Sequence, residues 1–228
     1  MAEVFQQLVQ ALTPGHATRV RTTGLAGASR AWVLSRLVQH LKTPLVCVTA
    51  DDDAADTLAS DLAFFLGGEG TKASPTVLRL PADEVLPWDE LLPDAGMVTE
   101  RLCTLFHLAR GTKFPALVLS ARALHRKVLP PKLMQSQSRT VKVNEDVGRD
   151  ALALSLAGMG FRNAPLVEDP GCFSLRGDIL DVWAPLHDEP TRIEFFGDTV
   201  DSMKRFDPET QRTTDKLSEL QLFPAREL

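Results

Sequence analysis

Short runs of alternating apolar and polar residues fill the stretch from Gly160 to Asp207 and constrain the fold more than any other feature of the chain. The runs cover Gly171–Leu175, Ile179–Trp183, Thr191–Phe196 and Ser202–Phe206. This pattern is typical of an antiparallel sheet with one buried and one exposed face. A helical pattern over Val147–Met159 precedes the runs, so we expect a compact α+β domain whose polar sheet face serves docking rather than catalysis.

The first half of the chain has a different pattern, in which continuous apolar runs alternate with helical ones. The strand candidates are Leu45–Val48, Thr76–Leu80 and Ala116–Leu119, and the helix candidates are Ala2–Leu12, Ala31–Leu41, Ala54–Leu66 and Met97–Ala109. Apolar runs of this kind indicate parallel strands covered on both faces. We therefore predict an α/β domain with a parallel sheet, followed by the α+β domain after a junction at Pro130–Pro131 and 135–138.

A glycine-containing turn between an extended run at Arg19–Thr22 and the second helix candidate has the layout of a phosphate-binding loop. Such a loop needs the pattern GxxxxGK[ST], in which the lysine reaches the phosphates and the hydroxyl holds Mg²⁺. Here Gly24 fits the first glycine, and the turn continues through Gly27. The other three positions differ: Ser29 replaces the second glycine, Arg30 the lysine and Ala31 the hydroxyl residue. We predict a degenerate loop without ATP hydrolysis, which packs a helix on a sheet.

Three consecutive carboxylates, Asp51, Asp52 and Asp53, follow the first apolar run. Consecutive residues at a strand-to-helix turn point in different directions, and acids are favoured at a helix start. We predict capping rather than metal binding. Cys47, Cys103 and Cys172 have no zinc-like spacing, so they are expected to be buried and reduced, and no metal or cofactor is predicted.

Charge and hydropathy exclude further classes of protein. The net charge of −5 argues against a dedicated nucleic-acid binder, although nine Lys or Arg residues and no acid lie between Arg101 and Lys142. Two oppositely charged solvated faces also account for this basic block. No apolar run is long enough to span a membrane and the amino terminus has no basic region before an apolar one, so a cytoplasmic protein is expected.

Several motifs resemble one protein family. The segments GCFSLRGDILDVWAP, TRIEFFGDTVDSMKRFDPETQRT and LQLFPAREL are similar to the second domain, and the return to the first, of the excision-repair protein UvrB and of the Mfd family of transcription-repair coupling factors. LPADEVLPWDELLPDAGMVTERLCTLFHL resembles the first domain of the same family, more closely that of Mfd. The chain is thus identified as similar to the amino-terminal, UvrB-like module of that family.

The resemblance implies a fold and a division into domains. It implies a RecA-like, degenerate P-loop domain over 1–128, an inserted UvrA-docking domain over 129–212 and a segment over 213–228 that starts the return to the first domain. A last strand, Leu217–Phe223, is expected in that segment. Because the chain stops as the first domain would resume, we expect it to be a piece of a longer protein.

The resemblance also implies a partner and its contact residues. The family recruits UvrA through the second domain, and by position Arg162 in GFRN, Arg176 in SLRGD and Glu194 in RIEFF match its contact residues. Ser174 stands where UvrB has a further arginine. Phe195 or its neighbour Phe196 is expected to add an apolar anchor, since strand alternation buries one of the two.

We therefore expect a noncatalytic adaptor. RNA polymerase and DNA are expected to bind only parts of the parent protein that are absent from this chain. The segment Trp88–Glu100 is short and the chain has no tyrosine, so the damage-probing hairpin of UvrB is not expected. Residual nucleotide binding at the loop, or DNA binding by the basic block, remains the alternative.

Overall fold

The computed structural model describes residues 2–12, 19–68, 70–72, 74–82, 94–125 and 127–227. The expected turn at 13–15 and most of Trp88–Glu100 lie outside these residues. The chain divides into two compact units, which are described separately below. One holds the described residues up to Ala82 together with Lys113–His125, and the other holds those from Asp94 to Thr112 and from Lys127 onward.

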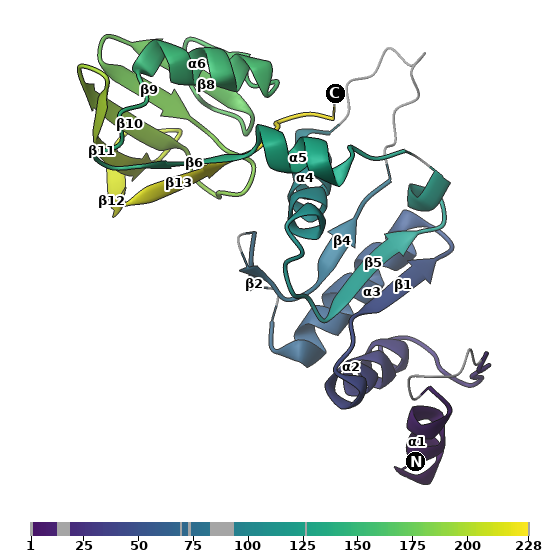
Figure 1. The fold of residues 1–228 in the computed structure, drawn as a ribbon. Coiled ribbons are helices and arrows are strands. Elements are labelled where there is room, and N and C mark those ends of the chain that lie inside the picture. The colour runs from purple at the N-terminus through teal and green to yellow at the C-terminus, as the bar shows by residue number, and fades with distance from the viewer. Residues whose placement is uncertain are drawn as a thin grey trace. The chain divides into compact units, whose positions relative to one another are not determined.

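The first unit is built around a parallel sheet (Figure 1). Its elements are α1 (Ala2–Ala11), α2 (Ser29–Leu41), β1 (Leu45–Thr49), α3 (Asp52–Leu66), β2 (Gly70–Thr71), β3 (Ser74–Pro75), β4 (Leu78–Leu80), β5 (Ala116–Ser120) and the 3₁₀ turn η1 (Ala123–His125). The strand order is β1-β5-β4, with both pairs parallel, whereas β2 and β3 form a separate hairpin. The three predicted apolar strands and their parallel arrangement are confirmed.

The core of this unit lies between the sheet and α3. Leu62 and Ala55 of α3 pack with Val118 of β5 and with Cys47 of β1, all of them buried. Helix α3 begins where predicted because Asp51 is its N-cap, and the carboxylate accepts a hydrogen bond of 2.8 Å from the backbone N–H of Ala54. The predicted capping role is therefore confirmed for Asp51.

The second unit contains the predicted antiparallel strands. Its elements are α4 (Ala95–Ala109), α5 (Pro131–Gln137), β6 (Arg139–Lys142), α6 (Arg149–Gly158), β7 (Arg162–Asn163), β8 (Cys172–Arg176), β9 (Ile179–Val182), β10 (Thr191–Phe196), β11 (Thr199–Phe206), β12 (Thr213–Leu217) and β13 (Glu219–Leu222). Six of these strands form one sheet in the order β12-β11-β10-β9-β8-β7. Its pairs are antiparallel except for β7 with β8, which is parallel. An α/β arrangement with an added antiparallel-strand domain is thus confirmed.

Helix α6 covers one face of the six-stranded sheet and closes the main core. Leu152 and Leu156 of the helix pack with Leu180, Ile193 and other fully buried residues of the central strands. The alternation read in the sequence is the cause, since every second residue of these strands points to this face.

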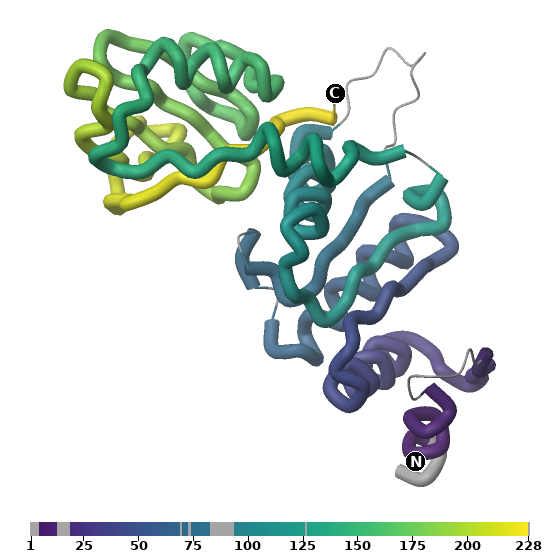
Figure 2. The backbone as a smooth tube through the Cα atoms, viewed as in Figure 1, coloured from purple at the N-terminus to yellow at the C-terminus, as the bar shows by residue number. Residues whose placement is uncertain are grey.

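The chain enters and leaves this part of the fold through neighbouring strands. β6 pairs antiparallel with β13, so that Arg139 faces Leu222 and Lys142 faces Glu219. The tube in Figure 2 shows these two segments, teal and yellow, running side by side. Further along, Phe223 stacks on Phe106 of α4 with ring centroids 4.4 Å apart, and Arg101 forms an ion pair with Glu227.

Three local expectations differ from the structure. Residues 19–23 belong to no strand, because this charged segment is exposed and has nothing to bury. The junction segment forms α5, with proline at its first position, where a missing N–H costs no helical hydrogen bond. The single strand expected over Leu217–Phe223 is two strands, since at Ser218 the chain changes partner from β11 to β6. The domain limits 1–128, 129–212 and 213–228 stay a prediction.

Candidate functional site

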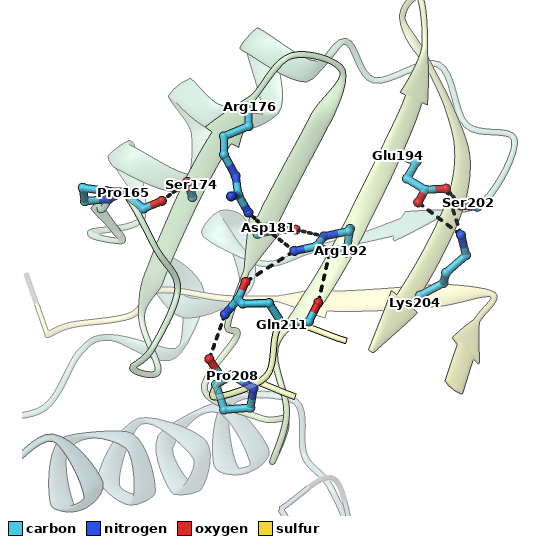
Figure 3. A network of polar contacts seen from close by, with 10 residues as sticks. All are labelled: Pro165, Ser174, Arg176, Asp181, Arg192, Glu194, Ser202, Lys204, Pro208 and Gln211. Carbon is cyan, nitrogen blue, oxygen red and sulfur yellow. Dashed lines mark hydrogen bonds and ion pairs between the residues drawn. The ribbon is translucent and has the colours of Figure 1, made fainter. Parts of the chain in front are cut away.

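The six-stranded sheet has a second face, opposite the core, that carries polar side chains at its centre. Strand register places these residues in two neighbouring rows across the sheet. The first row is Ser174, Asp181, Arg192 and Lys204, and the second is Arg176, Ile179, Glu194 and Ser202. We call this surface the polar face. Figure 3 shows its polar side chains linked by hydrogen bonds and ion pairs.

Asp181 lies at the centre of the polar face, and only 2% of its side chain is exposed. Arg192 donates from Nε to Oδ1 and from Nη2 to Oδ2, each over 2.8 Å. Arg176 donates from Nη2 to the same Oδ2 over 3.0 Å. One buried carboxylate therefore joins two arginines from the strands on either side of it, as hydrogen bonding of a buried charge requires.

The two arginines differ in exposure. Arg192 is 16% exposed and lies over the ring of Phe206 at 4.7 Å, whereas the side chain of Arg176 is 53% exposed. Hydrogen bonding to Asp181 raises the pKa of Arg192, so its charge is retained at any physiological pH. Arg176 is thus the member of this group that presents its guanidinium to solvent.

Glu194, in the second row, is held by a separate group of contacts. Ser202 donates to Oε2 over 2.5 Å, and Lys204 Nζ lies 3.1 Å from Oε1 and 3.0 Å from Oε2. The hydrogen bond from Ser202 and then that from Lys204 lower the pKa of Glu194 below its ordinary value. The carboxylate is therefore ionised at neutral pH and fixed in position on a partly exposed surface.

Arg162 lies at the edge of the same sheet, on β7, opposite Cys172 of β8. Its Nη2 is 3.4 Å from Asp169 and 3.3 Å from the Cys172 sulfur, and its side chain is 68% exposed. A shallow hollow of about 410 Å³ opens beside it, lined by residues of the segment 162–169 and by Cys172. Arg162 therefore belongs to the sheet of the polar face, but its register partner Cys172 is at the opposite end of β8 from Arg176.

The structure distinguishes the two phenylalanines of RIEFF. Phe195 is a buried member of the main core, whereas Phe196 is 83% exposed. Strand alternation places Phe196 on the side of Arg192 and Glu194. The side chain of Phe195 cannot reach a partner without opening the core, so of the two expected anchors only Phe196 is accessible, and its role as an anchor stays a prediction.

Ser174 is buried and has a contact within the chain. It is 3% exposed, and its hydroxyl donates to the carbonyl of Pro165 over 3.1 Å. This bond ties the segment after β7 to the polar face.

The residues of the predicted nucleotide loop come together as a closed turn in the first unit. Gly24 and Gly27 have φ angles of +80° and +54°, which favour glycine. Ser29 Oγ accepts from the N–H of Ala26 over 2.9 Å and donates to its carbonyl over 2.6 Å, and Arg30 is exposed. Ala31 is fully buried in the core. The position that would hold a magnesium-binding hydroxyl therefore faces the protein interior.

The basic block does not form a uniform cationic surface. Arg101 is 5% exposed and pairs with Glu227, while Arg139 and Lys142 pair with Glu145 and Glu219.

Within the described ranges, no group of three or more His, Cys, Asp or Glu residues could hold a metal ion, and no helix is long and apolar enough to cross a membrane. Cys47, Cys103 and Cys172 are buried, as predicted.

Sequence reasoning missed Asp181, Arg192, Ser202 and Lys204. A signal for the first two was present, because Asp181 interrupts the apolar run ILDVW and Arg192 precedes Glu194 by two residues on the same strand face. A buried acid in such a run requires a cationic partner on a neighbouring strand.

The chain is similar to known proteins along nearly its whole length. Residues 140–228 match the family model of the UvrB interaction domain. Over 224 residues, 98% of this chain, the sequence is 60% identical to the transcription-repair-coupling factor of Myxococcus xanthus. It is 30% identical to that of Staphylococcus aureus over 97% of the chain, and 27% identical to that of Bacillus subtilis over 98%.

The chain spans 18% of the length of each of these relatives. The family match covers α6, every strand of the polar face and all of β6 except Arg139. The chain therefore belongs with the amino-terminal, UvrB-like region of the transcription-repair-coupling factors, and its residues 140–228 form a UvrB interaction domain.

Proposed function

We propose that the polar face binds the excision-repair protein UvrA and that the chain acts as a noncatalytic adaptor in transcription-coupled repair. The observation that carries the proposal is that Arg176 and Glu194 lie on the same sheet face and that each is already held by contacts within the chain. Arg176 is bonded to Asp181, and Glu194 is bonded to Ser202 and Lys204. The name of the matched domain, and the name shared by the relatives, support a partner in excision repair.

Preorganisation makes this surface suitable for binding. A side chain that is already held in place loses less rotamer freedom when a partner docks, so more of the contact energy appears as affinity. Arg176 retains an exposed guanidinium suited to a carboxylate, and arginine is common among residues that dominate binding energy. Phe196 adds an exposed apolar ring at one end of the face, and Arg162 adds a second exposed guanidinium at the edge.

The first unit has a supporting role in this proposal. We assign it a RecA-like origin with a degenerate nucleotide loop, in which buried Ala31 and the internally bonded Ser29 leave no magnesium ligand. The domains would then be 1–128, 129–212 and 213–228. RNA polymerase and DNA would bind other parts of the longer protein, in the cytoplasm.

Calorimetric titration of UvrA with the chain tests the docking proposal. Arg176→Ala and Glu194→Ala should each weaken binding about tenfold, a loss of about 1.4 kcal/mol, while thermal unfolding changes little. Arg139→Ala is the matched control, because Arg139 also forms a partly exposed ion pair but lies on β6, outside the polar face. Equal affinities for all four proteins would refute the assignment of the site.

A DNA mobility shift separates this proposal from nucleic-acid binding. We expect no complex at moderate salt, because three cations of the basic block are already paired with carboxylates. A complex that forms at low salt and is lost steeply as salt rises would favour the DNA-binding alternative.

A further inference from the structure

Burial of the Asp181 carboxylate costs free energy, and packing alone does not explain why a charged residue occupies this position. A carboxylate that is 2% exposed, on the central strand β9, has lost nearly all of its hydration. Burial of a charge is unfavourable unless hydrogen bonds and opposite charges replace the water, and a buried ion pair often stabilises a fold no more than apolar residues would. The contacts of the two arginines indicate what else this carboxylate does.

Arg192 is fixed from several sides. Its guanidinium donates to both oxygens of Asp181, to the carbonyl oxygen of Gln211 and to the side-chain oxygen of Gln211, and it lies over Phe206. These contacts use Nε and both Nη atoms. Arg192 is therefore held through all three of its nitrogens and fixes Asp181 in one orientation.

Arg176 has the opposite character. Within the described residues its guanidinium has one hydrogen bond, from Nη2 to Asp181 Oδ2, and half of its side chain is exposed. It is the last residue of β8 and is followed by Gly177, so the chain leaves the strand directly after it. The orientation of its remaining donors thus depends on a single carboxylate oxygen.

Among the eight described residues that define the polar face, Glu194 is the one acid besides Asp181. Glu194, the acid in the same row, already accepts from Ser202 and Lys204. The group of Asp181 with two arginines has one positive charge in excess, and the exposed end of that group is Arg176. A carboxylate on the partner would complete it.

We infer that Asp181 is a positioning residue for docking, which holds the Arg176 guanidinium so that its free donors meet a carboxylate of UvrA. The inference rests on the proposed function and extends it to a residue that does not reach the surface. Without Asp181, Arg176 would have to be ordered by the partner. Immobilising one long side chain weakens binding roughly threefold to tenfold.

A double-mutant cycle tests the inference. Asp181→Asn keeps the side-chain volume and removes the charge. In the otherwise unaltered chain it should weaken UvrA binding roughly threefold to tenfold, but in the Arg176→Ala background it should have no further effect. In the Glu194→Ala background the effect of Asp181→Asn should be retained in full, because Glu194 has its own contacts. An equal loss in all three backgrounds would show that Asp181 has a general structural role and would overturn the inference.

A second measurement does not depend on UvrA or on a folded variant. In ¹⁵N relaxation of the unaltered chain, the order of the side-chain Nε–H of Arg176 should be close to that of Arg192 and well above that of an exposed arginine such as Arg212. A mobile Arg176 would also overturn the inference. If Arg176→Ala itself left UvrA binding unchanged, the proposed function would fail, whereas additivity in the cycle would remove the positioning role alone.

Discussion

Arg192 and Asp181 lie directly opposite each other on β10 and β9 and are joined by two hydrogen bonds of 2.8 Å. Two parallel bonds of this kind need a planar guanidinium, because a lysine ammonium cannot match both oxygens in the same fork. The stacking of Arg192 on Phe206 adds a second contact that an ammonium makes less well. The pair therefore depends on arginine, and not on positive charge alone.

Arg192→Lys should lower the free energy of unfolding by about 1–3 kcal/mol, since a charge-assisted bond to a buried carboxylate is lost. Urea unfolding followed by circular dichroism measures the change. Arg139→Lys, in a partly exposed pair with Glu145, is the control and should stay within about 0.5 kcal/mol. Similar stabilities for the two variants would contradict the importance of the fork geometry.

The two phenylalanines of β10 should respond oppositely to truncation. Phe195→Ala removes a ring from the main core and should cost about 3–5 kcal/mol of stability. Phe196→Ala, at a ring that is 83% exposed, should change stability by less than about 0.5 kcal/mol but weaken UvrA binding. Thermal unfolding and calorimetric titration of both variants give the two readouts. Unchanged affinity of Phe196→Ala would remove this ring from the proposed interface.

Acidification should weaken the fold partly through Glu194. Its folded-state pKa is lowered, chiefly by the hydrogen bond from Ser202, so the carboxylate contributes stability that is complete above its ordinary value of 4.5. That contribution is lost as the pH falls through the lowered folded-state value. Melting temperatures measured from pH 7 to pH 3 should therefore fall more steeply for the unaltered chain than for Glu194→Gln. Parallel curves would show that these contacts contribute nothing to folding.

Introducing the missing lysine and hydroxyl side chains should not give the loop the ability to bind a nucleotide. Arg30→Lys combined with Ala31→Ser recreates the lysine and the hydroxyl of the phosphate-binding pattern. We expect no heat of binding with Mg²⁺ and ATP for this variant or for the unaltered chain, because residue 31 faces the core. Ala31→Leu should in addition cost about 1–3 kcal/mol by overpacking. Clear binding of ATP to the unaltered chain would revive the nucleotide-binding alternative.

Local sequence patterns predicted which segments form helices and strands better than they predicted how those segments pair and pack. The runs Leu45–Val48 and Thr191–Phe196 became β1 and β10 because apolar runs, continuous or alternating, favour strands. Alternate residues of β10 are buried, as expected. The expected cover on both faces is wrong for β1, which is an edge strand whose Val46 and Val48 are 63% and 52% exposed. Helix α5 was missed because its two prolines and its Gln-Ser run are turn-like in isolation, and the burial of Met134 gives the helix its place. The change of partner at Ser218 likewise depends on β6, far away in the sequence.

The candidate site likewise has residues that the sequence alone could assign and residues whose role depends on how the strands pair. Arg176 and Glu194 could be assigned by resemblance, but Asp181 reads as an ordinary strand residue until the register brings Arg192 opposite it. Which of Phe195 and Phe196 is buried could not be decided from alternation alone, because the phase of the alternation is set by α6, which covers one face of the sheet.

The pairing of β6 with β13 has a practical consequence for protein engineering. Arg139 and Leu222 are register partners, and antiparallel partners have Cα atoms about 5 Å apart. The segment between them, with the whole polar face inside it, thus begins and ends at nearly one point. A loop of an unrelated carrier protein can span that gap, so the docking module should be transplantable as a cassette without stretching the backbone of its new host.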